Sequence, residues 1–168
     1  MTRERKGSVQ SMRSSPVSRA TLSLGSWCSE AWFSAALDGL VEAEGNVPVG
    51  GDALVHNDVR SDNLCFVGRR VVLVDWAQAI RGNPQQDLAS ALSTLPLEGG
   101  PDPFDVPPDG GPWAAHIAGQ CARRAAHETQ APQWLRMVFQ RIAVSCLNWA
   151  SRSLDLPPWT GPHWSEIR

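Results

Sequence analysis

The sequence predicts an α+β fold that is mainly helical and carries one small β-hairpin. Residues 64–67 and 71–74 are two short runs of β-forming side chains joined by Gly68-Arg69-Arg70, which is the pattern of a hairpin. Four longer stretches have apolar residues at helical spacing. With 168 residues the chain has the size of one domain.

The helices are expected at 29–44, 86–95, 113–128 and 133–152. Ser29 is a suitable N-cap for the first helix, and Gly45 is a natural stop. The last helix is apolar on nearly every side, so it should be buried on several sides. A short strand is expected at 53–55. The segment 96–112 is dense in Pro, Gly and Asp, and a loop of this length is usually a lid or disordered.

Composition and charge exclude some classes of partner. The net charge is -2, so no global basic field favours nucleic acid. No apolar run approaches the roughly 20 residues needed to cross a bilayer, and we expect no membrane partner. Residues 1–25 are rich in Ser and basic side chains and are expected to be a disordered tail, followed by one domain over 26–160 and a short tail at 161–168.

The four cysteines are widely spaced and form no C-x-x-C pair. We therefore expect reduced thiols and a cytoplasmic protein. Cys65 and Cys146 stand in apolar runs and are predicted to be core residues. A zinc site is not expected, because no metal-ligand spacing connects the cysteines and histidines. The cysteines are Cys28, Cys65, Cys121 and Cys146.

The segment 56–63 has the form H-x-D-x-x-x-x-N. Phosphoryl transfer asks a protein mainly to position groups and to neutralise charge. One carboxylate must accept the proton of the attacking hydroxyl, and further oxygen ligands must hold magnesium against the phosphates. The five-residue step from Asp58 to Asn63 lets one loop supply both kinds of group. The hairpin then returns the chain and places Asp75 beside that loop, which suits a hard cation.

Residues 54–89, LVHNDVRSDNLCFVGRRVVLVDWAQAIRGNPQQDLA, resemble the catalytic core of the aminoglycoside phosphotransferase and choline kinase-like family. The family pattern is an apolar strand, H-x-D-x-x-x-x-N, a hairpin, an apolar-Asp-Trp or -Phe step, and a later Asp followed by an apolar residue and Ala. All five parts occur here in order. The resemblance implies a protein-kinase-like large lobe. It also implies transfer of the γ-phosphoryl group of ATP to a small-molecule hydroxyl, with Mg²⁺.

The resemblance also implies a role for each matched residue. In the catalytic loop, Asp58 would be the base and His56 would brace the loop by hydrogen bonding. Asn63 and Asp75 would ligate Mg²⁺, and Asp87 would anchor the loop from below. Arg60 occupies a position where the family often has His or Arg, without an assigned role. No pattern identifies the acceptor, which is expected to bind among the C-terminal helices and the 96–112 loop.

The sequence departs from the family before the catalytic loop. Only 55 residues precede His56, whereas a nucleotide-binding lobe of five strands and a helix needs roughly 65. The only lysine, Lys6, has no strand around it. We therefore expect the N-terminal lobe to be largely missing and apolar surface to be exposed. Three hypotheses remain: a truncated remnant that is weak alone, an enzyme completed by a separate N-lobe chain or by self-association, and a non-catalytic binding module.

Overall fold

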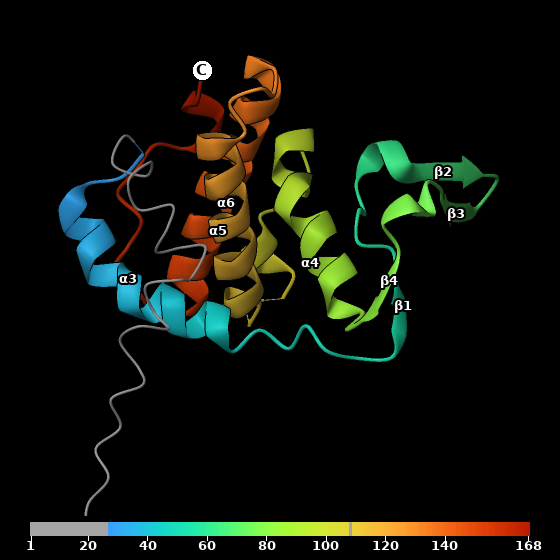
Figure 1. The fold of residues 1–168 in the computed structure, drawn as a ribbon, viewed down its shortest axis with the longest axis horizontal. Coiled ribbons are helices and arrows are strands. Elements are labelled where there is room, and N and C mark those ends of the chain that lie inside the picture. The colour runs from blue at the N-terminus through green and yellow to red at the C-terminus, as the bar shows by residue number, and fades with distance from the viewer. Residues whose placement is uncertain (1–26, 108) are drawn as a thin grey trace, which may run out of the picture.

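The computed structural model describes residues 27–107 and 109–168 (Figure 1). The expected tail over 1–25 lies outside them. Within the described residues the fold is mainly helical with two small antiparallel sheets, so the predicted α+β class is confirmed. The helices are α3 (Glu30–Gly45), α4 (Gln85–Thr94), α5 (Gly111–His127) and α6 (Gln133–Ser153). The strands are β1 (Ala53–Val55), β2 (Leu64–Val67), β3 (Arg70–Leu73) and β4 (Ile80–Gly82).

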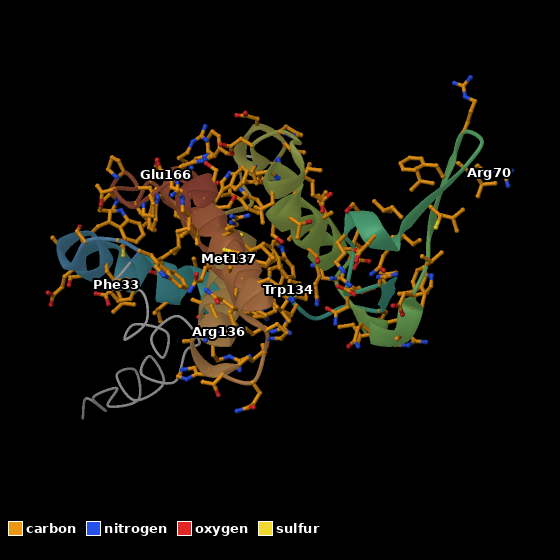
Figure 2. The ribbon with its side chains drawn as sticks, turned by 90° about the horizontal axis from the view of Figure 1, so that it is seen from above. Phe33, Arg70, Trp134, Arg136, Met137 and Glu166 are labelled. Atoms are coloured by element: carbon orange, nitrogen blue, oxygen red, sulfur yellow. The ribbon has the colours of Figure 1, made fainter. Side chains whose placement is uncertain are left out.

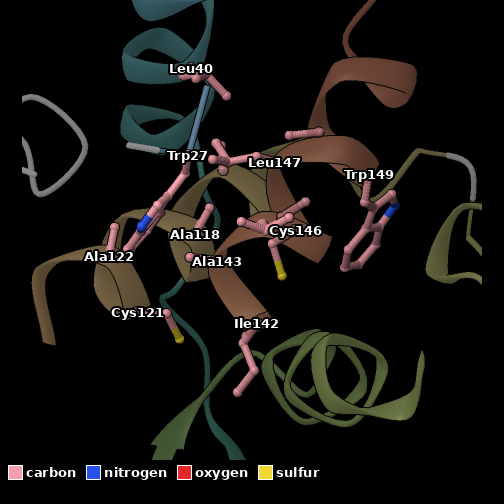
Figure 3. Packing of buried hydrophobic residues seen from close by; sticks show 14 of the residues in the cluster. Trp27, Leu40, Ala118, Cys121, Ala122, Ile142, Ala143, Cys146, Leu147 and Trp149 are labelled. Carbon is pink, nitrogen blue, oxygen red and sulfur yellow. The ribbon is translucent and has the colours of Figure 1, made fainter. Parts of the chain in front are cut away.

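The hydrophobic core lies between α3, α5 and α6, as Figure 3 shows. Leu40 of α3, Ala118 of α5 and Cys146 of α6 are almost completely buried. α6 is buried on several sides, as its all-round apolar sequence predicted. None of the described helices is long and apolar enough to cross a bilayer. The buried residues of α6 are Phe139, Ile142, Ala143, Val144, Ser145, Cys146, Leu147, Trp149, Ala150 and Ser151.

The capping that the sequence predicted for α3 is present. The Ser29 Oγ accepts a hydrogen bond from the backbone N–H of Trp32 at 3.2 Å. The indole N–H of Trp32 donates to the Pro157 carbonyl at 2.9 Å, and its ring packs edge-on against Trp159. These contacts connect the segment that follows α6, at Pro157 and Trp159, to helix α3.

The described part of the 96–112 segment packs against α6. Pro96 and Pro103 are buried. The guanidinium of Arg152 forms an ion pair with Asp102 at 2.7 Å and stacks over the ring of Phe104 at 4.0 Å. Residues 161–168 also contact this helix, since the Arg141 guanidinium donates to the Ile167 carbonyl at 2.9 Å.

The strands form two separate two-stranded sheets. The hairpin pairs β2 with β3, with Leu64 opposite Leu73 and Val67 opposite Arg70. The second sheet pairs β1 with β4, in the register Ala53 to Gly82. The sequence did not predict β4, because a three-residue strand becomes a strand only through its pairing with a distant segment.

The sheets stand apart from the core, with α4 between them and the helical bundle (Figure 1). The core cluster contains no residue between Ala43 and Leu92. Cys65 is exposed, so the prediction that it belongs to the core is wrong; its apolar neighbours lie on a hairpin with little against either face. Among the described residues, most exposed large apolar side chains lie between Val49 and Leu88. This region carries the apolar surface that was expected.

Candidate active site

The loop that follows β1 is tied to the first turn of α4. The two carboxylate oxygens of Asp87 accept the backbone N–H groups of His56 and Asn57, each at 2.7 Å. The Gln86 amide donates to the Asn57 side-chain oxygen. A carboxylate in the first turn of a helix is also favoured by the helix dipole. One helical turn therefore sets the position of the H-x-D segment.

His56 connects this loop to the end of the hairpin. Its side chain is completely buried, and its Nε2 donates to the Val74 carbonyl at 2.8 Å. The ring also packs against Trp76, with 4.6 Å between ring centroids. Nδ1 makes no hydrogen bond to any described residue. Because a carbonyl only accepts, Nε2 carries the hydrogen, and His56 occupies a bracing position between loop and hairpin.

Asn63 lies against Asp58, the residue five positions earlier. The Nδ2 of Asn63 donates to the Asp58 carbonyl at 2.8 Å and to Asp58 Oδ2 at 3.1 Å. The Arg60 Nε lies 3.3 Å from Asp58 Oδ1 and 3.1 Å from Asp62 Oδ1. Both oxygens of the Asp58 carboxylate therefore have a neighbouring donor, and about a third of that side chain remains exposed.

Asp75 follows the second strand of the hairpin, and its backbone lies next to that of Asn63. The N–H of Val74 donates to the Asn63 carbonyl at 3.0 Å, so Asp75 follows the residue paired with Asn63. Asp75 has left-handed backbone angles, φ 58° and ψ 65°, which turn the chain sharply after β3. Asn57, at the other side of the site, has φ 64°. Asn and Asp tolerate this conformation better than most residues.

A comparison with known protein families matches residues 24–137, about two thirds of the chain, to the phosphotransferase enzyme family. The match spans the whole of the site described above. The chain belongs to the phosphotransferase enzyme family. No curated protein and no solved structure matches it.

Membership in the phosphotransferase enzyme family makes phosphoryl transfer the chemistry to test against these side chains. With its Nδ2 turned to Asp58, Asn63 keeps its Oδ1 for another partner, and no described residue forms an ion pair with Asp75. An amide oxygen and a carboxylate are ligands that Mg²⁺ accepts, with water and phosphate oxygens supplying the rest. The described residues contain no group of three or more His, Cys, Asp or Glu that could hold a metal. Asn63 and Asp75 are therefore of the chemical kind that could ligate Mg²⁺ only together with water or phosphate oxygens.

Two contacts in this candidate site were not predicted. The Gln86 amide supports Asn57, and Arg60 bridges two carboxylates. For the contact between Gln86 and Asn57, the only signal in the sequence was that Gln86 precedes Asp87. The second had no signal, because the direction of the Arg60 side chain depends on the turn that follows.

Two cavities formed by the described residues lie away from these groups. A cavity of about 430 Å³ is lined by Arg136, Gln140 and Arg168, among others. A second, of about 220 Å³, lies between the 96–103 segment and α6 and is lined by Asn148 and Trp164, among others. Neither is lined by Asp58, Asn63 or Asp75, so neither identifies the acceptor.

Proposed function

We propose that this chain is a kinase-like phosphotransferase lobe that acts with ATP and Mg²⁺ on the hydroxyl group of a small molecule. One observation carries the proposal. Asn63 links the two carboxylates of the site, because its side chain donates to Asp58 while its backbone carbonyl accepts from Val74, the residue before Asp75. A proton acceptor and a pair of metal ligands are thereby held on one short stretch of backbone, which is what phosphoryl transfer requires.

In this proposal each residue has a limited task. Asp58 accepts the proton of the attacking hydroxyl, and the Asn63 amide orients its carboxylate. Asn63 Oδ1 and Asp75 would hold magnesium, which when bound neutralises charge on the phosphates. Asp87 and His56 position the loop and make no contact with substrate. Arg60 lies between the carboxylates of Asp58 and Asp62 and forms an ion pair with each of them.

We further propose that the chain alone is a weak catalyst. Kinases of this general kind use a lysine on the phosphates beneath a covering sheet. The sequence has one lysine, Lys6, which lies outside the described residues, and the described residues contain no strand before β1. The exposed apolar surface around the hairpin supports a second candidate function, that of a partner-dependent or non-catalytic module.

The test is a calorimetric titration of Mg-ATP into the purified chain. We expect weak binding that Asp75→Ala abolishes, because the substitution removes a metal ligand. Asp62→Ala is the matched control, since Asp62 is a nearby carboxylate that the proposal does not place on the metal, and this variant should bind Mg-ATP as the wild type does. Asp58→Ala should leave Mg-ATP binding unchanged.

The outcomes separate the candidates. Binding that depends on Asp75 supports the phosphotransferase lobe. A folded chain that binds no Mg-ATP would favour the non-catalytic module. Rapid phosphorylation of an alcohol by the purified chain, lost in Asp58→Ala, would contradict the claim that the chain is weak alone while supporting the role of Asp58.

A further inference from the structure

The cavity of about 430 Å³ lies at the end of the helical bundle where α5 ends and α6 begins. The C-terminus lies at the same end of the bundle (Figure 1). Figure 2 shows Arg136 and Met137 on the helical side of the molecule, apart from Arg70 at the far end of the hairpin. None of the wall residues belongs to the candidate active site, so the proposed function gives this cavity no role. The wall consists of Ala131, Gln133, Arg136, Met137, Gln140 and Arg168.

The charged side chains of the cavity wall all have the same sign. Arg136 and Arg168 carry guanidinium groups, and none of the wall residues is acidic. The acidic residues closest in sequence have other partners: Glu128 forms an ion pair with Arg124 at 2.8 Å, and Glu166 accepts a backbone N–H of its own turn at 2.9 Å. The backbone carboxylate of Arg168 forms no ion pair with a described side chain. The described residues therefore leave the positive charge of the cavity uncompensated.

The Arg136 side chain is held in place by the end of helix α5. Its Nε donates to the Ala125 carbonyl at 3.0 Å. Its two terminal nitrogens make no hydrogen bond to a described residue. The paired N–H groups of a guanidinium match the oxygens of a carboxylate or a phosphate, and such charge-assisted bonds are stronger than neutral ones. Arg136 therefore combines a fixed position with free donors.

Arg168 reaches the cavity from a second segment of the chain. The Nε and Nη2 of Arg141 both donate to the Ile167 carbonyl, at 3.2 and 2.9 Å, so the residue before Arg168 is tied to α6. The Arg168 guanidinium makes no hydrogen bond to a described residue. The side-chain amides of Gln133 and Gln140 are likewise without a partner among the described residues, and each can donate to an oxygen atom. An anion in the cavity would thus meet donors from two segments.

The volume of the cavity indicates the size of its ligand. Pockets that bind small molecules usually have volumes of roughly 300–1,000 Å³, and this cavity lies within that range. An inorganic anion would fill only part of it. Met137 and Ala131 provide apolar wall against which a carbon framework can pack. The wall therefore suits a small organic molecule that carries a phosphate or carboxylate group.

We propose that this cavity binds a small organic anion, whose phosphate or carboxylate group lies between Arg136 and Arg168. Gln133 and Gln140 supply further hydrogen-bond donors, and Met137 contacts the carbon framework. The inference goes beyond the proposed function and holds whether or not the chain transfers phosphate, because no wall residue lies in the H-x-D loop or in the hairpin.

Isothermal titration calorimetry of the full chain tests the proposal, in a phosphate-free buffer of low ionic strength without metal or nucleotide. We expect glycerol 3-phosphate, succinate or both to bind, and glycerol, which has no charge, not to bind. The tighter of the two anions identifies the preferred acidic group. Arg168→Gln should raise the dissociation constant about tenfold or more, because a charge-assisted hydrogen bond is lost. Arg123→Gln removes the same charge from an exposed arginine of α5 outside the cavity and should leave binding unchanged.

Arg136→Gln should also weaken anion binding, but it removes the bond to Ala125 as well. Arg168→Gln is therefore the decisive variant, since Arg168 is exposed and its substitution removes no hydrogen bond to a described residue. Failure of both anions to bind the folded wild-type chain would overturn the proposal. Equal weakening by Arg168→Gln and Arg123→Gln would overturn it in favour of a general charge effect. Binding that Arg60→Gln abolishes and Arg168→Gln leaves intact would overturn it in favour of the candidate active site. Because these titrations contain no Mg-ATP, their failure would leave the test of the proposed function unaffected.

Discussion

The backbone N–H of His56 donates a hydrogen bond to the Asp87 carboxylate, with 2.7 Å between the His56 nitrogen and Oδ2. The second carboxylate oxygen holds Asn57 at the same distance. The two partners are separated by about thirty residues, and β2, β3 and β4 lie between them in the chain. This carboxylate is therefore a main connection between the helical side of the molecule and the loop that carries Asp58.

We expect Asp87→Ala to make the loop that carries His56 and Asn57 more mobile, because both of its backbone hydrogen bonds to the carboxylate are lost. Each lost bond is a charge-assisted one, so the loss should cost about 2–4 kcal/mol in the stability of this region. Hydrogen exchange of the His56 and Asn57 amides should accelerate, and urea unfolding should occur at lower concentration. Asp62→Ala removes a carboxylate of an exposed ion pair and should change stability by about 0.5 kcal/mol or less. Equal amide protection in wild type and Asp87→Ala would contradict the anchoring role.

Asn57 provides a test of the left-handed backbone at the site. With φ 64°, an Ala at this position should be less stable than a Gly by about 1 kcal/mol, because only glycine adopts this region without a steric cost. Both variants lose the contact with Gln86, so their difference isolates the backbone term. Chemical denaturation of the two variants measures it, and Gln86→Ala reports the side-chain contact alone. Equal stabilities of the Ala and Gly variants would argue against the left-handed geometry.

The thiols of the described residues should differ sharply in reactivity. Cys65 is exposed on the hairpin, whereas Cys121 and Cys146 are buried between α5 and α6 (Figure 3). Burial raises the pKa of Cys121 to about 12, and burial together with the neighbouring Cys121 raises the pKa of Cys146 well above the usual range. Since the thiolate is the reactive form, a thiol reagent should label Cys65 rapidly in the native protein. Cys65→Ser should remove this fast phase, and rapid labelling of Cys121 in the folded protein would contradict the packing.

The same two thiols predict a loss of stability at alkaline pH. An exposed thiol in the unfolded chain has a pKa near 8.5, so above that pH the unfolded chain releases protons that the folded protein keeps. The free energy of unfolding should then fall as pH rises, by about 1.4 kcal/mol per pH unit for each thiol. Urea unfolding at several alkaline pH values measures the slope. Cys121→Ala should reduce the slope, and an unchanged slope would show that this thiol does not titrate on unfolding.

Much of the local structure was predictable because its signals lie within each segment. The capping of α3 by Ser29, the periodicity of α6 and the glycine turn of the hairpin depend on neighbours in sequence. The order of the site residues was also visible, and the family match covers it. The roles of Asp58, Asn63 and Asp75 stay predictions until binding and activity are measured.

The sequence by itself determined the order of the four helices and the hairpin, the α+β class and the phosphotransferase pattern, because hydrophobic period and motif spacing are properties of the chain. Only the tertiary structure decided that β4 pairs with β1, that Cys65 lies in solvent, and that the amide of Asn63 turns to Asp58. The first two depend on whether a distant segment packs against the residue, and the third depends on the conformation of the loop between Asp58 and Asn63. An apolar run such as 64–67 is the same sequence whether or not a partner covers it, so burial could not be read from it.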